Sequence, residues 1–417
     1  MCWTSARAGS RECSRERIDS REPSAKLKPV RAVIGLLMGS FVSLTIHAYL
    51  WWRLIRSAHL QRRTRRILTA ALVVAFLSVP VTTAARLAWP SFAAIIGWFT
   101  LTWIAFAGLT FVTLVALDVL RALGWGVDRV RNAPPRDPSR RQFLARATGG
   151  AAVAVAGASV AAGMLTARGE HEVVDVEVHL AKLPRALDGF TIVQLSDLHV
   201  GMTIGRGFVE RVVARTMALE PDLIALTGDL VDGTVPDLRD DVAPLGGLRA
   251  PHGVFATTGN HEYYAGVEPW LVELTRLGAR YLRNETVTIT RNGASFELVG
   301  IDDFSAEGHP GHGADLHRAL ATHDPALATV LMAHQPRQVM RARDHGIDFQ
   351  MSGHTHGGQI WPWHYLVRIQ QGGLLAGRYQ IGDTQLYVTR GCGYWGPPVR
   401  VLAPLEITRF ILRSGVA

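Results

Sequence analysis

Long stretches of hydrophobic residues fill most of the first 167 positions of the chain. Four runs, at 32–52, 67–85, 92–117 and 147–167, contain no Lys, Arg, Asp or Glu. A helix needs about 20 apolar residues to cross the ~30 Å hydrocarbon core of a bilayer. The pattern therefore predicts an all-α membrane region of about four transmembrane helices in residues 32–167, preceded by a basic tail at 1–31.

The arginines between these runs predict how the helices are oriented. Residues 53–66 contain six Arg and no acid, and residues 118–146 contain seven Arg and three Asp. Short basic loops stay on the cytoplasmic side, so everything after residue 168 is expected outside the cytoplasm. The same scheme places the basic tail outside, against the rule. Either this start lies too far upstream or the first run does not cross.

The fourth run differs in composition from the other three. Of its 21 residues, 13 are Ala or Gly, and it follows the motif Ser-Arg-Arg-Gln-Phe-Leu at 139–144. An arginine pair before a weakly hydrophobic run resembles a twin-arginine export signal, so the export machinery is an expected partner. The alternative is an arginine pair of an ordinary basic loop. No clear cleavage site follows, and the run is expected to remain as an anchor.

Residues 168–417 show the short apolar runs of an α/β domain. Runs at 191–196 and 223–227 flank a helical pattern at 207–219, which predicts two parallel strands joined by a helix. A hairpin is predicted at 287–299 around Asn292-Gly293. A further helix is predicted at 270–277, and further strands at 254–258, 329–332, 347–351, 385–389 and 405–412.

Charge and cysteine content exclude several classes of protein. Residues 1–167 carry 22 Lys+Arg against 7 Asp+Glu, whereas residues 168–417 carry 22 against 28. The folded domain is therefore acidic, and nucleic-acid binding is not expected. Of the three cysteines, only Cys392 lies after residue 167, which excludes an internal disulfide and a cysteine-ligated zinc site there.

Metal-ligating side chains follow the predicted strands where each strand ends. Open α/β sheets build their sites at that edge, and residues at i and i+2 of extended chain project to the same side. The side chains offer oxygen and imidazole nitrogen but no sulfur, which suits two divalent ions sharing a carboxylate. The predicted metal ligands are Asp197, His199, Asp229, Asn260, His334, His354 and His356.

The order of these residues resembles the calcineurin-like metallophosphoesterase superfamily. The family pattern is D-x-H, G-D-x-x-D, G-N-H-[DE], H and G-H-x-H, and the chain matches all five blocks from about residue 191 onward. The motifs at 353–359 and 387–391, with Pro397-Pro398, resemble its membrane-associated bacterial branch. The resemblance implies a layered sandwich of two mixed β-sheets flanked by helices.

The resemblance also implies a role for each residue. Asp197, His199 and His356 would hold one ion, Asn260, His334 and His354 the other, and Asp229 would bridge them. A hydroxide between the two ions would attack the phosphorus. His261 would be the catalytic residue, giving a proton to the leaving oxygen or a hydrogen bond to the phosphate. The expected ions are Mn, Fe or Zn.

Several residues are given secondary interpretations. Glu262, Asp232, Asp302 and Asp303 are candidates to orient the ligand histidines, although Asp303 fits an ordinary turn carboxylate better. His309 and His312 fit an exposed mobile loop better than a third metal site. Cys392 is expected to be buried. At least half of a set of aromatic residues is expected to pack on the sheet rather than contact a lipid or nucleobase: Trp361, Trp363, Tyr365, Tyr394 and Trp395.

The sequence as a whole predicts a multi-pass cell-membrane phosphoesterase with an extracytoplasmic catalytic domain. Its substrate would be a phosphomonoester or phosphodiester, and the anchor favours a phospholipid or a lipid-linked pyrophosphate, with a role in lipid metabolism. Membrane lipids are therefore expected partners. The alternatives are a UDP-2,3-diacylglucosamine-type pyrophosphatase facing the cytoplasm, a nucleotide phosphodiesterase, and a non-enzymatic membrane sensor or scaffold.

Overall fold

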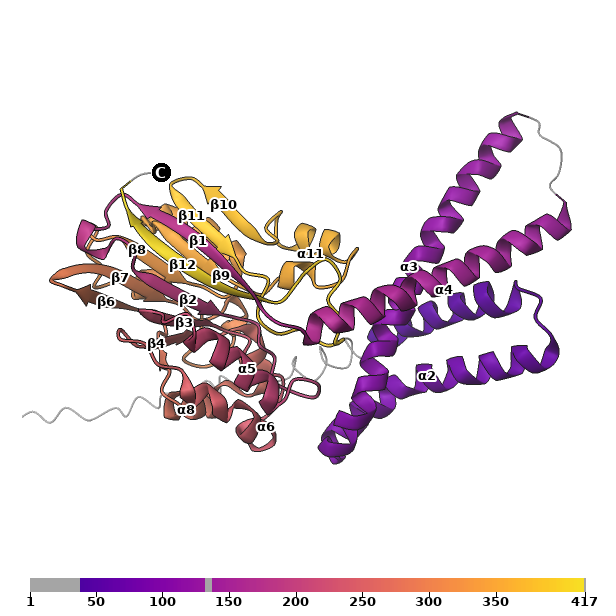
Figure 1. Ribbon diagram of the computed structural model, residues 1–417, viewed down its shortest axis with the longest axis horizontal. Coiled ribbons are helices and arrows are strands. Elements are labelled where there is room, and N and C mark those ends of the chain that lie inside the picture. Colours follow the sequence, from indigo (N-terminus) through magenta and orange to yellow (C-terminus); the bar gives the residue numbers. More distant parts are fainter. Residues whose placement is uncertain (1–37, 132–136, 416–417) are drawn as a thin grey trace, which may run out of the picture. The chain divides into compact units, whose positions relative to one another are not determined.

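The computed structural model describes residues 38–131 and 137–415 (Figure 1). The chain divides into two compact units, Met1–Leu44 and Thr45–Ala417. The described part of the first unit, residues 38–44, is helical. The second unit contains the remaining helices and both β-sheets.

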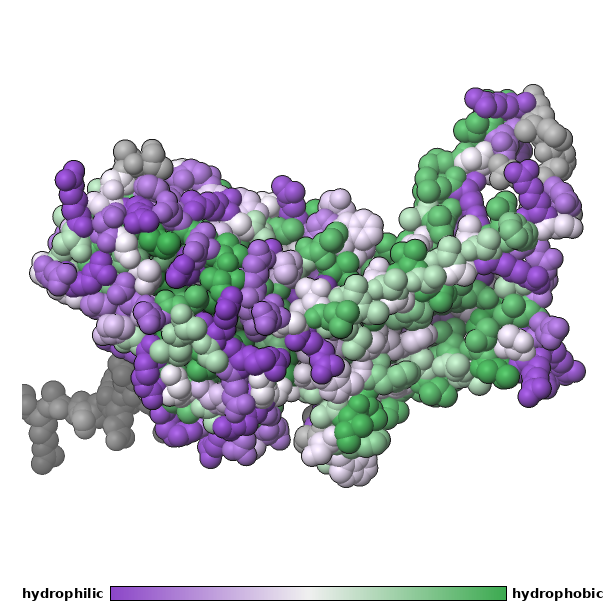
Figure 2. Space-filling view, viewed as in Figure 1, coloured by the Kyte–Doolittle hydropathy of each residue, from purple (hydrophilic) through white to green (hydrophobic). Residues whose placement is uncertain are grey.

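Most of the described residues between 38 and 168 are helical. Among these residues, three helices are long and apolar enough to cross a membrane, within 62–86, 91–130 and 142–168. They contain the second, third and fourth hydrophobic runs, and their surfaces are mostly hydrophobic (Figure 2). Residues 38–50 of the first run are helical, and the rest of its prediction lies partly outside the described residues. The elements are α2 (Arg62–Ala88), α3 (Pro90–Val130), α4 (Pro138–Arg168) and a π-helical turn at Trp51–Arg56.

Helix α3 continues well beyond the predicted run at 92–117. Its extension carries Asp118, which accepts two hydrogen bonds of 2.7 Å from Arg53 and one of 2.7 Å from Tyr49. Arg121, one turn further, also approaches Asp118 at 3.2 Å. Pairing stabilises charges near the end of an apolar run, where an unpaired carboxylate would be costly. The polar residues after 117 therefore stay helical.

Two six-stranded mixed sheets form the second half of the chain, as the sequence predicts (Figure 1). The first sheet has the order β1-β12-β2-β3-β4-β5, in which β2 to β5 run parallel and β12 is antiparallel to β2. Its strands are β1 (Glu172–Leu180), β2 (Thr191–Leu195), β3 (Leu223–Thr227), β4 (Val254–Thr257), β5 (Arg280–Tyr281) and β12 (Glu406–Ser414).

The second sheet has the order β10-β11-β9-β8-β7-β6. Strands β7, β8, β9 and β11 are parallel, and the predicted hairpin forms the antiparallel pair β6-β7. The parallel strands of both sheets can thus bring their carboxyl ends to one edge. The strands are β6 (Glu285–Arg291), β7 (Ala294–Gly300), β8 (Thr329–Met332), β9 (Phe349–Ser352), β10 (Gly377–Ile381) and β11 (Thr384–Val388).

Side chains alternate between two cores because successive strand residues point to opposite faces. Ile192 of β2 belongs to the core between the two sheets, and its neighbour Val193 to the core beneath the helices. Trp270, fully buried, packs in the latter core. The helices are α5 (Arg206–Met217), α6 (Val235–Val242), α7 (Asn260–Ala265), α8 (Val267–Arg276), α9 (Leu316–Ala319), α10 (Val339–Ala342) and α11 (His364–Gln370).

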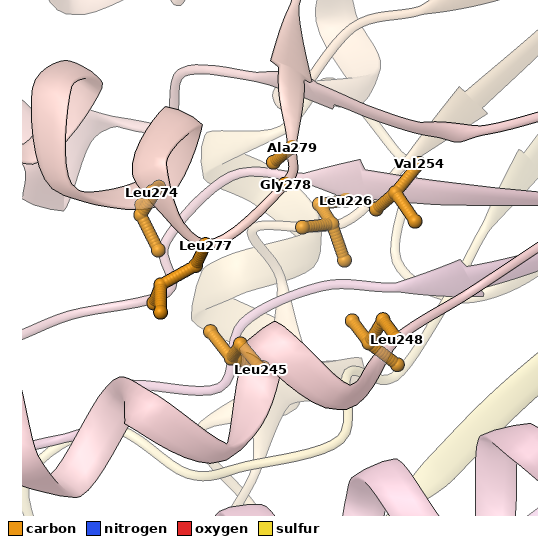
Figure 3. A pocket seen from close by; sticks show the side chains of 8 residues that line it. All are labelled: Leu226, Leu245, Leu248, Val254, Leu274, Leu277, Gly278 and Ala279. Atoms are coloured by element: carbon orange, nitrogen blue, oxygen red, sulfur yellow. The ribbon is translucent and has the colours of Figure 1, made fainter.

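A small gap in the helix-covered core shows how closely this domain is packed (Figure 3). Its volume is about 10 Å³, room for no more than about one water molecule. The gap is therefore a packing defect and not a ligand pocket. It is lined by Leu226, Leu245, Leu248, Val254, Leu274, Leu277, Gly278 and Ala279.

Candidate metal centre

Five strand ends bring the predicted ligands to one edge of the two sheets. Strands β2, β3 and β4 of the first sheet and β8 and β9 of the second end directly before them. Backbone hydrogen bonds join the strand ends, for example from the Asp197 amide to the Gly228 carbonyl (3.1 Å) and from the Gly353 amide to the His334 carbonyl (2.9 Å). The structure therefore places all seven predicted ligands in one cluster.

The backbone at this edge is strained. Five predicted ligands have positive φ angles: Asp197 (57°), His199 (52°), Asp229 (53°), His354 (72°) and His356 (51°). A non-glycine residue in this region costs on the order of 1–3 kcal/mol and persists only where the surroundings enforce it. Such strain gathers at functional sites, and here it turns each side chain from its strand toward a shared centre.

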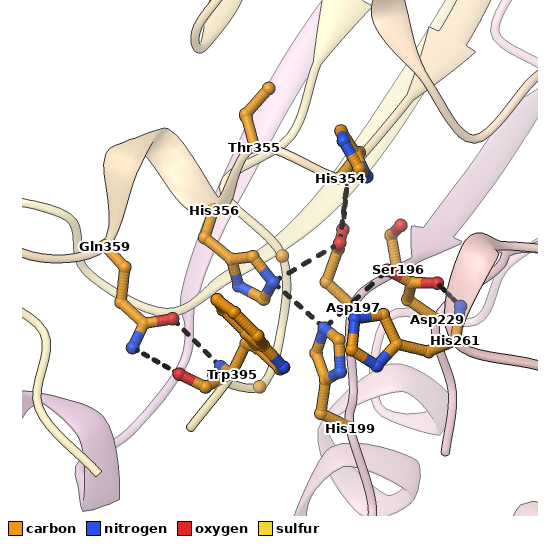
Figure 4. A network of polar contacts seen from close by, with 12 residues as sticks. Ser196, Asp197, His199, Asp229, His261, His354, Thr355, His356, Gln359 and Trp395 are labelled. Atoms are coloured by element: carbon orange, nitrogen blue, oxygen red, sulfur yellow. Dashed lines mark hydrogen bonds and ion pairs between the residues drawn. The ribbon is translucent and has the colours of Figure 1, made fainter. Parts of the chain in front are cut away.

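The first cluster joins Asp197, His199 and His356 (Figure 4). His199 Nε2 lies 3.0 Å from His356 Nε2, and His356 Nε2 lies 3.5 Å from Asp197 Oδ1. The Asp197 carboxylate is fully buried and accepts the His354 backbone N–H at 2.8 Å. Asp197 is thereby locked in place with its oxygens toward the histidines.

The second cluster joins Asp229, Asn260, His334 and His354. His334 Nε2 lies 3.0 Å from Asp229 Oδ2, 3.2 Å from Asn260 Oδ1 and 3.2 Å from His354 Nδ1. Asp229 Oδ2 is also 3.9 Å from His199 Nε2 of the first cluster. The Asp229 carboxylate therefore lies between the two clusters, where a bridging ligand would have to lie.

Hydrogen bonds fix the tautomers of His334 and His199, so that one ring nitrogen of each keeps a lone pair that can bind a cation. His334 Nδ1 donates to the Thr227 carbonyl at 2.8 Å, and His199 Nδ1 donates to Asp232 at 2.9 Å. The Nε2 lone pairs of both rings therefore face Asp229, which is itself an acceptor. Lone pairs converging on a carboxylate repel one another unless a cation or a proton lies between them. This donor set fits two divalent ions.

His261 lies beside the clusters rather than within the predicted ligand set. Its Nδ1 is 2.6 Å from Asp232 Oδ1, and its ring packs edge-on against that of His199 with centroids 4.5 Å apart. Its backbone N–H donates to Asp229 Oδ1 at 2.8 Å. Asp232 thus orients both His199 and His261, as expected for a carboxylate that supports ligand histidines.

The other candidate orienting carboxylates contact different groups. Buried Glu262 accepts the backbone N–H groups of Asp229, Leu230 and Gly259 at 2.7–3.0 Å, so it fixes two strand ends and not a histidine. Asp302 pairs with Arg283 through two bonds of 3.0 Å. Asp303 is buried. Its carboxylate accepts the Ser305 backbone N–H and, through both oxygens, the Gln335 side-chain amide, as expected for a turn carboxylate.

Burial and neighbouring charges shift the pKa values in the cluster. Burial disfavours the imidazolium of His199, but Asp232, Asp229 and Asp197 outweigh it and raise its pKa to about 9. Burial also opposes the Asp229 carboxylate, yet His334 and His199 lower its pKa strongly. Burial and the nearby His199 charge lower the pKa of His356 well below its ordinary value. Burial also opposes the imidazolium of His334, but Asp229 and Asp197 raise its pKa.

Arg400 is a functional residue that the sequence analysis did not identify. Its guanidinium is buried, with Nη2 3.1 Å from His356 Nδ1 and 2.7 Å from the Arg390 carbonyl. Its Nε donates to the Gly393 carbonyl at 2.8 Å. Arg400 therefore positions His356 together with the loop at 390–393. The only available signal was an arginine in a long segment that lacks acidic residues.

Much of the loop at 308–313 is exposed, as expected, but the His312 side chain is not. That side chain is only 3% exposed, with Nε2 2.7 Å from Glu268 and Nδ1 3.1 Å from the Tyr263 hydroxyl. The Tyr263 ring also packs against His309. These contacts join the loop to helices α7 and α8, so aromatic packing and a carboxylate order it without a metal.

The aromatic residues divide between packing and exposure. Tyr394 is buried, and Trp363 packs against α3 instead of the sheet. Trp361, Tyr365 and Trp395 are 47%, 58% and 57% exposed, so the expectation that at least half pack on the sheet is wrong. Cys392 is fully buried, as expected. The Trp395 ring lies 5.9 Å from that of His261, at the edge of the metal centre (Figure 4).

Known proteins share this arrangement of motifs. The profile of the calcineurin-like phosphoesterase family matches residues 190–358. A Bos taurus transmembrane protein with metallophosphoesterase domain is 40% identical over 60% of this chain and 59% of its own length. An uncharacterized metallophosphoesterase of Bacillus subtilis (strain 168) is 33% identical over 66% of this chain and 98% of its own length.

The chain spans about three fifths of the length of the first curated relatives that it matches. A dimetal phosphatase structure from Danio rerio matches 49% of this chain and 88% of its own, at 13% identity and a TM-score of 0.32. This chain covers almost the whole length of the Bacillus subtilis relative, and that similarity establishes the family. The chain belongs to the calcineurin-like metallophosphoesterases.

Proposed function

We propose that the chain is a membrane-anchored phosphoesterase that requires two divalent ions and hydrolyses phosphomonoesters or phosphodiesters. The position of Asp229, between two histidine clusters and within 3.9 Å of an imidazole nitrogen of each, carries this proposal. A carboxylate shared by two such clusters is what a dinuclear site requires.

The residues divide into two ligand sets around Asp229. Asp197, His199 and His356 would hold one ion, and Asn260, His334 and His354 the other. When bound, two divalent ions lower the pKa of water and neutralise charge on the phosphate. The buried Asp197 carboxylate and the strained backbone preorganise the ligands, so little rearrangement is needed at the moment of reaction.

His261 is the proposed proton donor to the leaving oxygen. Its Nδ1 bonds to Asp232, which leaves Nε2 to donate toward the substrate. The side chain is 15% exposed, so it can reach a substrate that enters from solvent or from a bilayer. General acid catalysis of this kind contributes about 10²–10⁴-fold to a rate.

Activity of the full chain tests the proposal. The protein purified in detergent is assayed on bis(p-nitrophenyl) phosphate with Mn²⁺, then after chelation and after Mn²⁺ is restored. We expect hydrolysis that chelation abolishes and the metal restores. His261→Ala should lower kcat about 10²–10³-fold while two ions remain bound by elemental analysis.

His345→Ala is a matched histidine control, because that side chain, on η6 (Arg343–His345), bonds to the Arg341 carbonyl of α10, outside the clusters. It should keep wild-type activity. Full activity after chelation, or unchanged kcat in His261→Ala, would contradict the proposal. A protein that binds two ions but hydrolyses no phosphate ester would favour the sensor or scaffold alternative.

We also propose that the anchor directs the enzyme to lipid-linked phosphate esters outside the cytoplasm. The basic segments 53–66 and 118–146 support this orientation, and the Arg140-Arg141 pair supports export through the twin-arginine machinery. If the domain faced the cytoplasm instead, a UDP-2,3-diacylglucosamine-type pyrophosphatase would be the better interpretation. Soluble nucleotide diesters tested beside lipid esters distinguish the nucleotide phosphodiesterase alternative.

A further inference from the structure

Six large apolar side chains near the metal centre are exposed to an extent that packing does not explain. We call this set the apolar rim; three of its members lie on one short helix, α11, in which no residue is buried. Exposed contiguous apolar surface marks a contact with protein or membrane. The rim consists of Trp361 (47% exposed), Tyr365 (58%), Leu366 (63%), Ile369 (76%), Trp395 (57%) and Leu402 (83%).

The rim adjoins a seam in which the catalytic domain packs against the membrane helices. Ile360, Trp363, Val399 and Val401 share a hydrophobic cluster with residues of α3 and α4. The Trp363 ring lies so close to Gly108 of α3 that an added β-carbon would be about 3.0 Å from it.

A backbone hydrogen bond strengthens this seam, from the Arg400 amide to the Gly163 carbonyl of α4 (2.9 Å). The segment before α11 is thus attached to both helices.

The helices at the seam also present apolar side chains outward. On α3, Ile95, Phe99 and Ile104 are 72%, 54% and 40% exposed, as expected for lipid-facing positions. Trp363 packs at Gly108, within the same apolar run. Ile369 follows Trp363 by six residues, about 9 Å along a helix. The rim therefore continues from the segment that contacts α3.

The charge of this segment fits a bilayer surface as well. Between Asp348 and Glu406 the only acidic residue is Asp383, whereas this stretch contains four arginines. The domain as a whole has an excess of acidic residues. An apolar helix face with basic and neutral flanks is the pattern of an interfacial membrane segment.

The rim also leads to the metal centre. Gln359 bonds to the Trp395 carbonyl and amide, both at 2.9 Å, and the Trp395 ring lies edge-on to His261. Trp361 donates its backbone N–H to the Val401 carbonyl at 3.2 Å, beside Leu402. A molecule lying along the rim would reach His261 without leaving apolar surroundings.

We propose that the apolar rim is seated in the headgroup and upper acyl region of the bilayer that the helices cross, and that the metal centre receives its phosphate ester laterally from that bilayer. The seating follows from the rim and the seam alone, whereas the delivery of substrate rests on the proposed function. The substrate class is an amphiphile whose phosphate lies at the headgroup level.

Spin labels test the seating in the full chain reconstituted in phosphatidylcholine–phosphatidylglycerol vesicles. Cysteine replaces Ile369 in one variant and Val272 of α8 in another, with Cys2 and Cys13 changed to Ser. Val272, 71% exposed, is the matched apolar control. Cys392 does not interfere, because burial raises its pKa to about 12.

A nitroxide at 369 should collide mainly with O₂ and little with a nickel chelate, and a nitroxide at 272 should show the reverse. Equal access of the nickel chelate to both labels overturns the seating. Low access of both reagents to 369 overturns it too, because it would mean that a protein or a second copy covers the rim.

Two chromogenic esters test the delivery, hexadecyl and methyl p-nitrophenyl phosphate, in the same vesicles. Wild type should prefer the hexadecyl ester in kcat/KM by about tenfold or more, since the alkyl chain concentrates it in the bilayer. Leu366→Ser/Ile369→Ser should reduce that preference at least about fivefold, and Val272→Ser should retain it.

Lateral delivery and the phosphoesterase proposal can fail separately in these experiments. Hydrolysis of both esters with equal preference in wild type and the double variant overturns lateral delivery, while the phosphoesterase proposal survives. Hydrolysis of neither ester, together with no hydrolysis of the monoester p-nitrophenyl phosphate, refutes the phosphoesterase proposal and with it the delivery, whereas the spin labels still decide the seating.

Discussion

The Asp232 carboxylate contacts both His199, a proposed metal ligand, and His261, the proposed general acid. Its Oδ1 lies 2.9 Å from His199 Nδ1 and 2.6 Å from His261 Nδ1. We predict that Asp232→Asn lowers kcat about 10–100-fold, because a neutral amide oxygen accepts the two Nδ1–H groups more weakly than the carboxylate does. Because the two residues act together, adding His261→Ala should lower activity less than the product of the single effects.

Asp240→Asn, on an exposed position of α6, is the matched control and should retain full activity. The kinetics of the wild type and the four variants are measured at saturating Mn²⁺, so that a change of metal affinity is not mistaken for a change of kcat. If the effects of Asp232→Asn and His261→Ala multiplied fully, the two side chains would act independently and the shared role would be wrong.

His171 makes folding dependent on pH at a position outside the metal centre. Burial lowers its pKa to about 4, although its ring bonds to the Cys392 carbonyl at 2.7 Å. Between pH 6.5 and 4 the unfolded chain therefore binds a proton that the folded chain does not. The contribution of His171 to stability is complete above pH 6.5 and falls by roughly 2–3 kcal/mol as the pH drops toward 4.

Unfolding of wild type and His171→Gln in detergent at pH 7.5 and pH 5 measures this effect. Glutamine cannot become charged here and can still donate to the carbonyl. The wild type should lose about 2 kcal/mol more than the variant on going to pH 5. An equal loss in both proteins would show that other groups cause the acid sensitivity.

At the residue scale, the sequence identified the candidate metal ligands but not the side chains that hold those ligands in position. Asp197, His199 and Asp229 could be identified because each follows an apolar run that ends a strand. Arg400 could not, because its contacts are to carbonyls and to His356, 44 positions away in the chain. Glu262 was identified as a supporting carboxylate, but its bonds to three backbone amides depend on two strand ends meeting in space.

Among the structural elements, the turn after β9 depends on Gly353. A β-carbon at this position would collide with the Ser196 hydroxyl and the Asp197 carboxylate. We predict that Gly353→Ala displaces Asp197 and removes at least one bound ion per chain, with activity reduced about 10²-fold or more. Metal content by elemental analysis and kcat on the same preparation measure the effect.

Gly207→Ala is the control for this prediction. Gly207 lies in α5 with open space around it, and alanine favours a helix, so the change should be neutral or slightly stabilising. The Gly353 explanation fails if Gly353→Ala retains two ions and full activity. If Gly353→Ala does not fold, far-UV circular dichroism of the two variants side by side reveals it.

Buried parallel strands were predictable, whereas the edge strands β1, β5 and β10 were not. Strands β3 and β8 are continuous apolar runs with every residue buried, and both were predicted within their observed bounds. Strand β1 alternates charged and apolar residues and pairs with β12, more than 200 residues later. This alternation is the local pattern of a half-buried strand, but the pairing with β12 cannot be read from any local pattern. Strand β10 pairs on one side only, at the sheet edge.

For the whole molecule, the charge distribution and the helix connections indicate the same membrane orientation. The α2–α3 connection lies next to the catalytic domain, because Arg86 Nη2 donates to the Asp232 carbonyl at 2.8 Å. Helix α4 also ends at the domain, at Arg168, before β1 begins. The described parts of the segments 53–66 and 118–146 lie at the opposite ends of these helices and carry arginines. If the three helices cross a bilayer, as we propose, the domain and the basic segments lie on its opposite sides.

We predict that the basic segments face the cytoplasm and the domain does not. Cysteines at Gln61, Trp89 and Val272, one per chain, are treated in intact cells with a membrane-impermeant maleimide, again with Cys2 and Cys13 changed to Ser. Trp89→Cys and Val272→Cys should react in intact cells, and Gln61→Cys only after permeabilisation, because positive residues are retained inside. The reverse pattern would place the metal centre in the cytoplasm and favour the nucleotide-linked lipid pyrophosphate. Labelling of Gln61→Cys and Val272→Cys from the same side would contradict the crossing of α2 that the helix connections require.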